Sequence, residues 1–379
     1  MKLLIDENIP GAASAFDCFG EVRVLPGRAI TRAALHDIEA LLVRSVTRVD
    51  RTMLEGTPVR FVASATAGID HVDTQALAEL GIAFAHAPGS NADSVVDYVL
   101  AVLALAFPPP AGLQGRCVGI IGCGQVGGRL LRRLRALGVP CRVHDPLLGA
   151  AAPPEEAPLA EVLAADIVTL HVPLTREGAH ATQHMISARE LRALRDDALL
   201  INAARGAVVE NGVLRDALLQ RPQLRAVLDV WENEPLPDRA LLARVLVGTP
   251  HIAGYAWDGK LRGASQVFEA LAAFAGLEWG AGAATGLCAP SVGDLREHDC
   301  GSWQEAVLAC YDPRHDDARL RAVALEQDRT ARAAGFDRLR RDYPPRREFS
   351  AWRIGAAVQP RSAVYGELLA AGFSPYTAD

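Results

Sequence analysis

The sequence predicts an α/β protein built on parallel sheets, and three observations support this prediction. Short apolar runs of strand length alternate with helix-like stretches from the N-terminus to about residue 255. One of these runs leads into a glycine-rich turn that opens a helix. Several other runs are followed at once by polar residues. Alternating strands and helices favour a parallel sheet, whose ligands bind at the carboxyl ends of the strands.

The segment 115–145 contains, in order, a strand, a glycine turn, a helix, a second strand and an acidic residue. Gly122, Gly124 and Gly127 have G-x-G-x-x-G spacing, and Asp145 closes the segment. Such glycines allow a tight turn, close approach of a pyrophosphate and close packing of helix on strand. A carboxylate in the place of Asp145 can bind a ribose diol and would repel a 2′-phosphate. The segment therefore predicts a Rossmann domain that binds NAD, in preference to an ordinary glycine-rich turn.

Length and composition limit the number of domains, the partners and the cellular compartment that we expect. The chain has 379 residues, enough for two or three domains. Its net charge of −6 gives no reason to expect nucleic acid as a partner. The seven cysteines include no C-x-x-C pair, which favours a reduced, cytoplasmic protein. The N-terminus has no signal-peptide pattern, and the longest apolar run is too short to span a bilayer, so we expect no membrane partner.

In the first part of the chain, strand candidates alternate with helical stretches. The strands are expected at 2–5, 40–43, 60–63 and 82–85, and the helices at 31–37 and 74–80. Polar clusters at 44–47 and 64–70 follow two of these strands, and Gly68 would let backbone N–H groups form an anion nest. Turn chemistry would explain either cluster alone. Two clusters at equivalent strand ends favour a substrate site.

The rest of the chain predicts a second sheet and a separate C-terminal region. Its strand candidates are 117–121, 139–144, 166–172, 198–202, 226–230 and 246–248. An apolar helix ending near Phe107 is expected to lead into this second domain, and a helix at 259–275 to return to the first. A small-residue linker, 280–289, precedes helix candidates at 303–310, 329–341 and 362–371 and a strand-like stretch at 349–358.

These patterns predict three domains. The first is discontinuous, residues 1–92 and 256–280; the Rossmann domain covers 93–255; the C-terminal domain covers 281–379. No metal site is expected, because His180 and His184 have i, i+4 spacing but no third ligand candidate nearby.

Three residues at predicted strand ends point to acid–base chemistry. Arg205 follows Asn-Ala-Ala, Glu234 stands in Asp-Val-Trp-Glu-Asn-Glu-Pro, and His251 stands in Thr-Pro-His. An imidazole ordinarily titrates near neutrality and can take a proton from a hydroxyl group. A carboxylate can orient that imidazole, and a guanidinium can bind a substrate carboxylate through two donors. Each residue alone would more often be a surface or loop residue.

With the glycine turn, these segments resemble the NAD-dependent D-2-hydroxyacid dehydrogenases, and the likeness covers residues 1 to about 280. The resemblance implies a Rossmann domain with a flavodoxin-like, discontinuous substrate domain. It implies that His251 is the proton acceptor, that Glu234 orients it and that Arg205 binds the substrate carboxylate. The backbone at Ala67 and Gly68 would hold the other carboxylate oxygen.

The resemblance also implies a set of NAD-binding residues. They lie in the glycine turn, at the end of the second strand and in the loops that follow later strands: Gly122, Gly124, Gln125, Val126, Gly127, Asp145, Thr175, Ala203, Ala204, Arg205, Asp229 and Gly254.

Several stretches are closer to one branch of this family, whose members oxidise a small phosphorylated 2-hydroxy acid. They are 41–47, 64–73, 251–270, 307–322 and 336–350. The last two belong to a C-terminal extension that resembles a dimerisation domain of α/β type, which implies a homodimer. The likeness implies that Ser45, Thr66 and Tyr255 bind substrate.

The substrate phosphate needs cationic partners, and Arg44 stands beside Ser45 at a strand end. We therefore expect Arg44 to contact the phosphate. Arg346 and Arg347 could reach a site across a dimer, although a solvated basic turn is the favoured interpretation. Two alternatives stay open. One is another family member with a phosphorylated substrate, such as a phosphoglycerate dehydrogenase, whose regulatory tail differs in kind. The other is an NAD-sensing binding protein.

Overall fold

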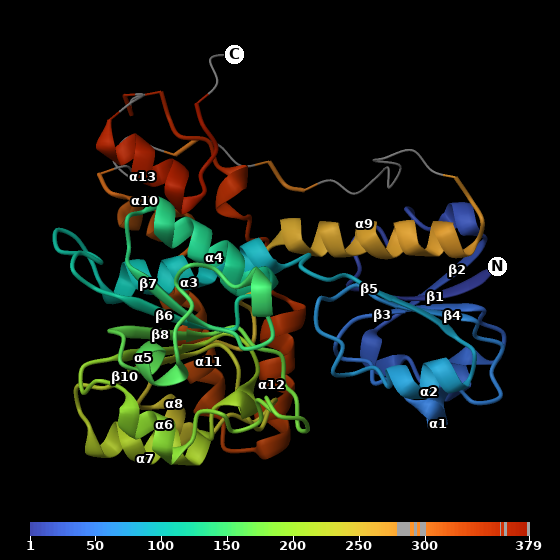
Figure 1. Cartoon of the computed structure of the whole chain (residues 1–379). Helices are drawn as coiled ribbons and strands as arrows, with labels where there is room; N and C mark the ends of the chain where they lie inside the picture. Colours follow the sequence, from blue (N-terminus) through green and yellow to red (C-terminus); the bar gives the residue numbers. More distant parts are fainter. Residues whose placement is uncertain (279–288, 292–293, 296–300, 357, 360–361, 377–379) are drawn as a thin grey trace. The chain divides into compact units, whose positions relative to one another are not determined.

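The chain forms two compact units in the computed structural model, which describes residues 1–278, 289–291, 294–295, 301–356, 358–359 and 362–376 (Figure 1). The first unit comprises Met1–Asn91 and Ala256–Ser291, and the second comprises Ala92–Tyr255 and Val292–Asp379. The C-terminal segment thus forms one unit with the segment that carries the glycine turn. The predicted linker, 280–289, lies outside the described residues except for Ala289.

The first unit is built on a five-stranded parallel sheet with the order β2-β1-β3-β4-β5. This is the flavodoxin-like order. The strands are β1 Lys2–Asp6, β2 Glu21–Leu25, β3 Ala40–Val43, β4 Phe61–Ser64 and β5 Ala83–His86. Both β3 and β4 are buried throughout, because helices and turns cover both faces of the sheet; this is why β3 is a continuous apolar run and β4 is apolar up to its last residue, Ser64.

Helices α1 Arg51–Leu54, α2 Thr74–Glu79 and α9 Trp257–Phe274 cover this sheet, with 3₁₀ turns at Asp17–Phe19, Gly27–Ala29 and Arg32–Leu35. The chain returns to the unit through α9, whose Phe268 packs on Phe16 and Phe19 at ring distances of 5.6 and 5.0 Å. A helix was predicted over 31–37, but the chain forms only the short 3₁₀ turn Arg32–Leu35 there. Strand β2 was not predicted, because it is a half-exposed edge strand of mixed polarity.

The second unit is built on a six-stranded parallel sheet with the order β11-β10-β9-β8-β6-β7. Its strands are β6 Val118–Ile121, β7 Cys141–His144, β8 Ile167–Leu170, β9 Leu199–Asn202, β10 Arg225–Leu228 and β11 Val247–Gly248. A parallel bridge between Val143 and Glu156 adds a further chain segment beside β7. The strand order reverses at β6, the strand before the glycine turn, and ligands of such sheets bind at this switch point. The predicted Rossmann and flavodoxin-like folds are confirmed.

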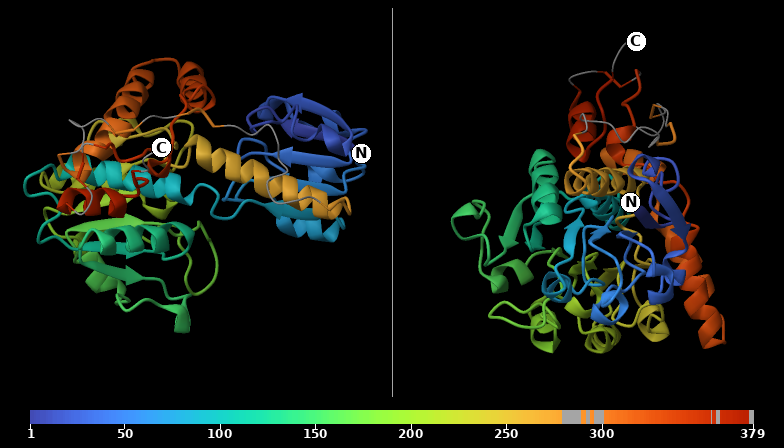
Figure 2. Two further views of the ribbon diagram at one scale, coloured as in Figure 1. Left: turned by 90° about the horizontal axis from the view of Figure 1, so that it is seen from above. Right: turned by 90° about the vertical axis from the view of Figure 1, so that its right-hand side faces the viewer.

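Helices lie on both faces of this sheet (Figures 1 and 2). They are α3 Ala92–Ala106, α4 Gln125–Ala136, α5 Leu159–Leu163, α6 Ala188–Ala193, α7 Asn211–Gln220 and α8 Arg239–Leu242, with 3₁₀ turns at Gly149–Ala151 and Gly206–Val208. One core cluster gathers α3 and α4 with the C-terminal segment, and a second gathers the helices of the opposite face. Among the described residues, no helix is long and apolar enough to cross a membrane.

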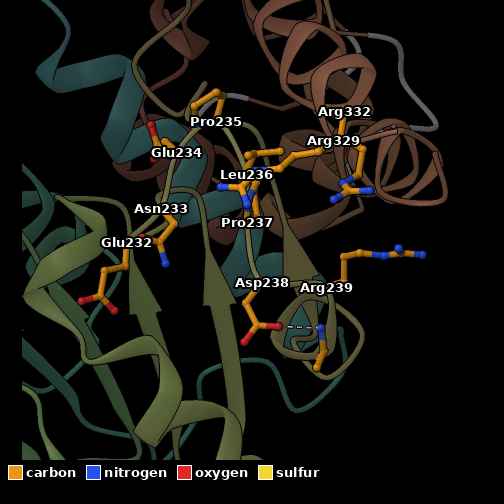
Figure 3. A pocket seen from close by; sticks show the side chains of 11 residues that line it. Glu232, Asn233, Glu234, Pro235, Leu236, Pro237, Asp238, Arg239, Arg329 and Arg332 are labelled. Atoms are coloured by element: carbon orange, nitrogen blue, oxygen red, sulfur yellow. Dashed lines mark hydrogen bonds between the residues drawn. The ribbon is translucent and has the colours of Figure 1, made fainter. Parts of the chain in front are cut away.

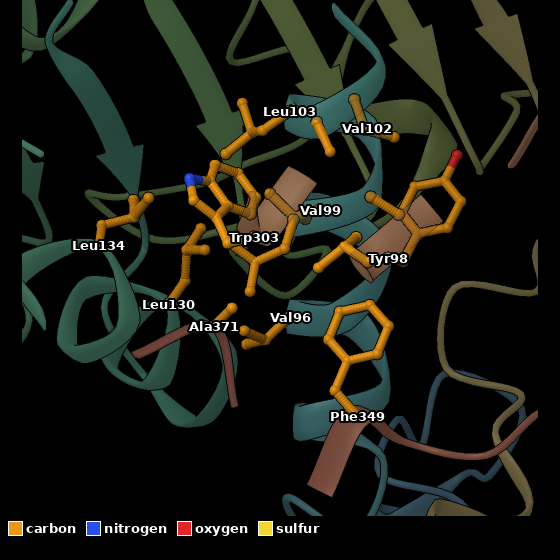
Figure 4. Close-up of a cluster of buried hydrophobic side chains, with 14 of the residues drawn as sticks. Val96, Tyr98, Val99, Val102, Leu103, Leu130, Leu134, Trp303, Phe349 and Ala371 are labelled. Carbon is orange, nitrogen blue, oxygen red and sulfur yellow. The ribbon is translucent and has the colours of Figure 1, made fainter. Parts of the chain in front are cut away.

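The C-terminal segment is helical and packs on this unit. It contains α10 Trp303–Cys310, α11 Pro313–Ala324, α12 Arg329–Arg341, a 3₁₀ turn at Phe349–Ala351 and α13 Ala363–Ala371. Figure 4 shows Trp303 of α10 beside Val99 and Leu103 of α3, with Phe349 near Tyr98. This cover explains why α3 is apolar on almost every side.

The prediction of α/β character for the C-terminal region was wrong. In place of a strand at 349–358, the described residues there form a 3₁₀ turn and isolated bridges through Arg353. The apolar residues of this stretch, such as Phe349 and Ile354, point into a helical core instead of a sheet. Helix α11 was not predicted, because its sequence is strongly charged.

Candidate active site

The glycine turn connects β6 to α4 in a conformation that requires glycine. Gly122 has a φ of +87°. A β-carbon on Gly127 would lie 2.0 Å from the carbonyl oxygen of Gly122. A β-carbon on Gly124, by contrast, would have nothing within 4 Å, so the face of this residue is open. The turn thus fits a pyrophosphate, which needs open backbone at the N-terminus of a helix.

Asp145 stands directly after β7 and connects this strand end to the glycine turn. Its carboxylate accepts the N–H of Cys123 at 2.8 Å and that of Leu147 at 3.2 Å. The acid therefore lies beside the turn, where the Rossmann arrangement places a ribose diol. The remaining predicted NAD residues stand at the start of α4 or in loops after β8, β9, β10 and β11: Gln125, Val126, Thr175, Ala203, Ala204, Asp229 and Gly254.

Glu234 and His251 form a hydrogen-bonded pair. Nδ1 of His251 lies 2.8 Å from Oε2 of Glu234, and Oε1 of Glu234 accepts the N–H of Trp231 at 2.9 Å. Burial alone would raise the pKa of Glu234. The charge and hydrogen bond of His251, the Arg340 guanidinium and the Trp231 N–H together hold that pKa below its usual range. An ionised carboxylate accepts from Nδ1 and leaves Nε2 of the imidazole available for a substrate.

Asp229 holds the loop that carries His251. Its carboxylate is buried and accepts the Thr249 hydroxyl at 2.6 Å and the N–H groups of Ile252 and Ala253 at 2.8 and 2.9 Å. Its carbonyl oxygen accepts the N–H of His251 at 2.7 Å. The carboxylate is thus already engaged by the loop, and a contact between Asp229 and NAD stays a prediction.

Arg205 follows β9 in a loop that is braced by its neighbours. The Asn202 side chain accepts the Ala204 N–H at 3.1 Å and donates to the Arg205 carbonyl at 2.9 Å. A β-carbon on Gly206 would lie 2.0 Å from the backbone of Trp231. The Arg205 loop is therefore packed closely against the start of the Glu234 loop, so the unit brings the predicted catalytic residues onto adjoining loops.

The predicted substrate residues of the first unit follow two neighbouring strands, β3 and β4. Thr66 donates its hydroxyl to the carbonyl of Gly68 at 3.0 Å and shares a hydrogen bond of 2.8 Å with Ser64. Arg44 donates to the carbonyl of Asn8 at 2.9 Å, and Ser45 stands next to it. Arg44, Ser45, Thr66, Ala67 and Gly68 belong to the first unit, whereas Tyr255 belongs to the second.

Two arginines of the C-terminal segment support this site; Arg340 was not predicted, and Arg346 was considered only as a residue that could reach a site across a dimer. Arg340 of α12 lies with its guanidinium carbon 5.5 Å from the ring centre of Tyr255, and its charge acts on Glu234. Arg346 donates to the backbone just after His251 and is only 8% exposed. The interpretation of Arg346 as a solvated turn residue was therefore wrong. Both stand in an arginine-rich sequence that gives no sign of which arginines are buried.

A pocket opens beside the loop that carries Glu234. It is lined by 232–240 and by Arg329 and Arg332 of α12, and Figure 3 shows these two arginines near Leu236 and Pro237, away from Glu232. Glu232 itself lies 2.5 Å from Nε2 of His184. In the described parts of the chain, no three His, Cys, Asp or Glu residues are grouped as metal ligands.

Comparison with known proteins identifies the class. Residues 106–253 match the D-isomer specific 2-hydroxyacid dehydrogenase NAD-binding domain, and residues 296–368 match a domain of unknown function. A protein from Thermus thermophilus superposes with a TM-score of 0.61 at 29% identity, covering 73% of this chain and 98% of its own. The NAD⁺-bound 3-phosphoglycerate dehydrogenase of Entamoeba histolytica has the same fold, with a TM-score of 0.63 at 22% identity, covering 73% and 95%. Fold and site thus define an NAD-dependent dehydrogenase of the D-isomer specific 2-hydroxyacid class.

Two curated relatives narrow this class. The erythronate-4-phosphate dehydrogenase of Azotobacter vinelandii is 49% identical over 360 residues, covering 93% of this chain and 94% of its own. That of Pseudomonas aeruginosa is 47% identical over 366 residues, covering 95% and 96%. The chain belongs to the erythronate-4-phosphate dehydrogenase family.

Proposed function

We propose that this protein oxidises 4-phospho-D-erythronate with NAD to (R)-3-hydroxy-2-oxo-4-phosphooxybutanoate, a step in the biosynthesis of pyridoxal 5′-phosphate. The observation that carries this proposal is the Glu234–His251 pair at 2.8 Å, on a loop that adjoins the Arg205 loop of an NAD-binding domain. The likeness to the erythronate-4-phosphate dehydrogenases covers 93–95% of the chain, including the C-terminal segment, and this supports 4-phospho-D-erythronate as the substrate.

In the proposed reaction, His251 is the general base. Its Nε2 accepts the proton of the C2 hydroxyl, while Nδ1 donates to the Glu234 carboxylate, which stabilises the imidazolium that forms. The O–H electron pair becomes the second bond of the C2 carbonyl, and the C2 hydrogen leaves with its electron pair. NAD, when bound, supplies the nicotinamide that accepts this hydride. Arg205 binds the substrate carboxylate. Its guanidinium also stabilises the negative charge that develops on the C2 oxygen during the reaction.

The far end of the substrate has its own proposed partners. The hydroxyl groups of the substrate would be bound by Ser45, Thr66 and Tyr255. Its phosphate would be bound by Arg44, and its carboxylate would also contact the backbone of residues 67–68. A doubly charged phosphate favours guanidinium donors, since such charge-assisted hydrogen bonds are stronger than neutral ones. The proposed NAD contacts are Gly122, Gly124, Gln125, Val126, Gly127, Asp145, Thr175, Ala203, Ala204, Arg205, Asp229 and Gly254.

We also propose that the protein is a cytoplasmic homodimer formed through residues 281–379. Sedimentation of the full chain tests the dimer, with two chain masses expected and one chain mass contradicting it.

Substrate competition tests the function. NADH formation is followed by absorbance with 4-phospho-D-erythronate, 3-phosphoglycerate and D-lactate, and the expected result is a clear preference for the first. A preference for 3-phosphoglycerate would overturn the substrate but keep the reaction. Because reduced cofactor could stay bound, each assay is repeated with a 2-oxo acid acceptor present; absence of turnover under both conditions would favour an NAD-sensing binding protein.

A further inference from the structure

The backbone just after His251 is held by two buried charged side chains. The Asp229 carboxylate accepts the N–H groups of Ile252 and Ala253 at 2.8 and 2.9 Å. Arg346 donates from Nη2 to the carbonyl oxygens of the same two residues, with 3.3 Å to that of Ile252. The two residues that follow the histidine therefore have both their N–H and their C=O groups bound by charged partners.

His251 needs this support because of its backbone conformation. Its φ is +58°, in the left-handed region that a residue with a β-carbon rarely adopts because it crowds the following carbonyl oxygen. Such conformations persist only where the surrounding structure fixes them. If the carbonyls of Ile252 and Ala253 were released, the loop would be free to relax and the imidazole would lose its alignment with Glu234.

Arg346 is itself fixed within the C-terminal segment. Its guanidinium carbon lies 4.3 Å from the ring centre of Tyr311 and 5.8 Å from that of Tyr343. The buried Asp316 accepts the hydroxyl groups of both tyrosines, at 3.0 and 2.8 Å. A guanidinium bound to aromatic faces and carbonyl groups has few alternative positions, because its planar fork of donors is rigid.

We propose that Arg346 is a positioning residue for His251, and that through it the C-terminal segment takes part in catalysis. The proposal rests on the proposed role of His251 as general base. Arg346 touches no reacting atom; it acts by holding the two peptide groups that set the direction of the imidazole. Removing it should therefore slow the chemical step more than it weakens NAD binding.

The chain supplies a matched control for a purely structural role. Arg321, also in the C-terminal segment, donates to the carbonyl oxygens of Leu242 and Val245 at 2.7 and 3.0 Å. It therefore makes the same kind of bond between the C-terminal segment and the sheet unit. Its acceptors, however, precede β11 and do not belong to the His251 loop.

The experiment compares full-length Arg346→Met, Arg346→Lys and Arg321→Met by steady-state kinetics with 4-phospho-D-erythronate, protiated and deuterated at C2. Arg346→Met should lower kcat about 10- to 100-fold, the scale of a small misplacement of a catalytic group, with the KM for NAD nearly unchanged. The isotope effect on kcat should rise as hydride transfer becomes slower. Arg346→Lys should recover part of kcat, and Arg321→Met should keep kcat within about 2-fold of wild type.

The outcomes separate this inference from the function on which it rests. His251→Ala is measured alongside; if that variant keeps its activity, the proposed base is wrong. If His251→Ala is inactive while Arg346→Met has wild-type kcat, or while Arg346→Met and Arg321→Met lose activity equally, the positioning role is overturned. If Arg346→Met does not fold, Arg346→Lys and Tyr343→Phe decide: a lowered kcat with a raised isotope effect supports the role, and wild-type values refute it.

Discussion

Nδ1 of His251 lies 2.8 Å from Oε2 of Glu234, whose other oxygen accepts the N–H of Trp231 at 2.9 Å. The carboxylate is thus fixed at both oxygens before any substrate binds. Because its pKa is held below the usual range, it stays ionised at neutral pH and fixes the imidazole with the proton on Nδ1. The orientation of the base is therefore a property of the folded chain.

Replacing Glu234 with Gln should lower kcat by roughly 10²- to 10⁴-fold, the scale seen when the carboxylate behind a catalytic histidine is neutralised. The amide keeps the shape of the side chain but no longer stabilises the imidazolium. The measurement is steady-state NADH formation together with the Kd for NADH. The Kd should change little, because Glu234 is proposed to act on the histidine and not on the cofactor.

Glu232→Gln is the matched control for this prediction. Glu232 stands in the same loop and also pairs with a histidine, at 2.5 Å from Nε2 of His184. Its loss should affect stability more than kcat. Equal losses of kcat in the two variants would contradict the specific role of Glu234.

Alanine at Gly127 should mainly reduce thermal stability, whereas alanine at Gly124 should mainly weaken NADH binding. A β-carbon on Gly127 would meet the Gly122 carbonyl at 2.0 Å, so Gly127→Ala should lower Tm, as overpacking does. A β-carbon on Gly124 meets nothing within 4 Å, although its φ of −76° with ψ of −140° lies outside the regions that a residue with a β-carbon prefers. Gly124→Ala should therefore lower Tm less than Gly127→Ala does but bind NADH about 10-fold more weakly or worse, because the methyl group takes the space of the pyrophosphate.

Thermal unfolding and NADH titration of both variants check this pair. Gly212→Ala in α7 is the control, since a β-carbon there also meets nothing within 4 Å. It should leave both Tm and Kd near wild type. Wild-type NADH affinity in Gly124→Ala would place the pyrophosphate elsewhere.

Neutralising Asp145 should relax the choice of cofactor. Asp145→Asn keeps an oxygen for the Cys123 N–H but removes the charge that would repel a 2′-phosphate. The ratio of kcat/KM for NADP to that for NAD should rise at least ~10-fold, which is ~1.4 kcal/mol. Asp166→Asn is the control, because Asp166 likewise accepts a backbone N–H, that of Cys117 at 2.8 Å. An unchanged ratio in Asp145→Asn would argue against a ribose contact.

The sheets could be predicted from the sequence because most strands are buried on both faces. Strand β3 is a continuous apolar run followed at once by Arg44 and Ser45, and β9 is apolar up to its last residue, Asn202, so that a polar residue shows where each run ends. The edge strand β2 lacks this signal, since half-exposed positions tolerate Glu21 and Arg23. The glycine turn was predictable because backbone geometry alone dictates Gly122 and Gly127.

The supports of the site could not be predicted in the same way. The burial of Arg346 depends on Tyr311 and Tyr343, and its acceptors, Ile252 and Ala253, lie more than ninety residues away in the sequence. Sequence spacing carries no information on such a contact. Asp229 illustrates the same limit, because only the folded loop shows its carboxylate bound to backbone N–H groups.

His171 should make the stability of this protein depend on pH. It follows β8, its Nε2 lies 3.0 Å from the Thr169 hydroxyl, and its Nδ1 is buried with no hydrogen-bond partner among the described residues. Burial lowers the pKa of His171 to about 3. The unfolded chain binds a proton there below about pH 6.5, whereas the folded chain does not until about pH 3.

Stability is therefore lost as the pH falls through 6.5, by about 1.4 kcal/mol for each further pH unit. The substitution His171→Gln keeps a nitrogen near the place of Nε2. It removes the pH-dependent loss of unfolding free energy that His171 causes. Urea unfolding near pH 7.5 and near pH 5.5 should show a smaller loss of unfolding free energy on acidification for His171→Gln than for wild type, by about 1.4 kcal/mol. The exposed His180 serves as control, and His180→Gln should follow wild type. A loss equal to wild type in His171→Gln would mean that His171 becomes protonated in the folded protein and that its burial does not oppose the charge.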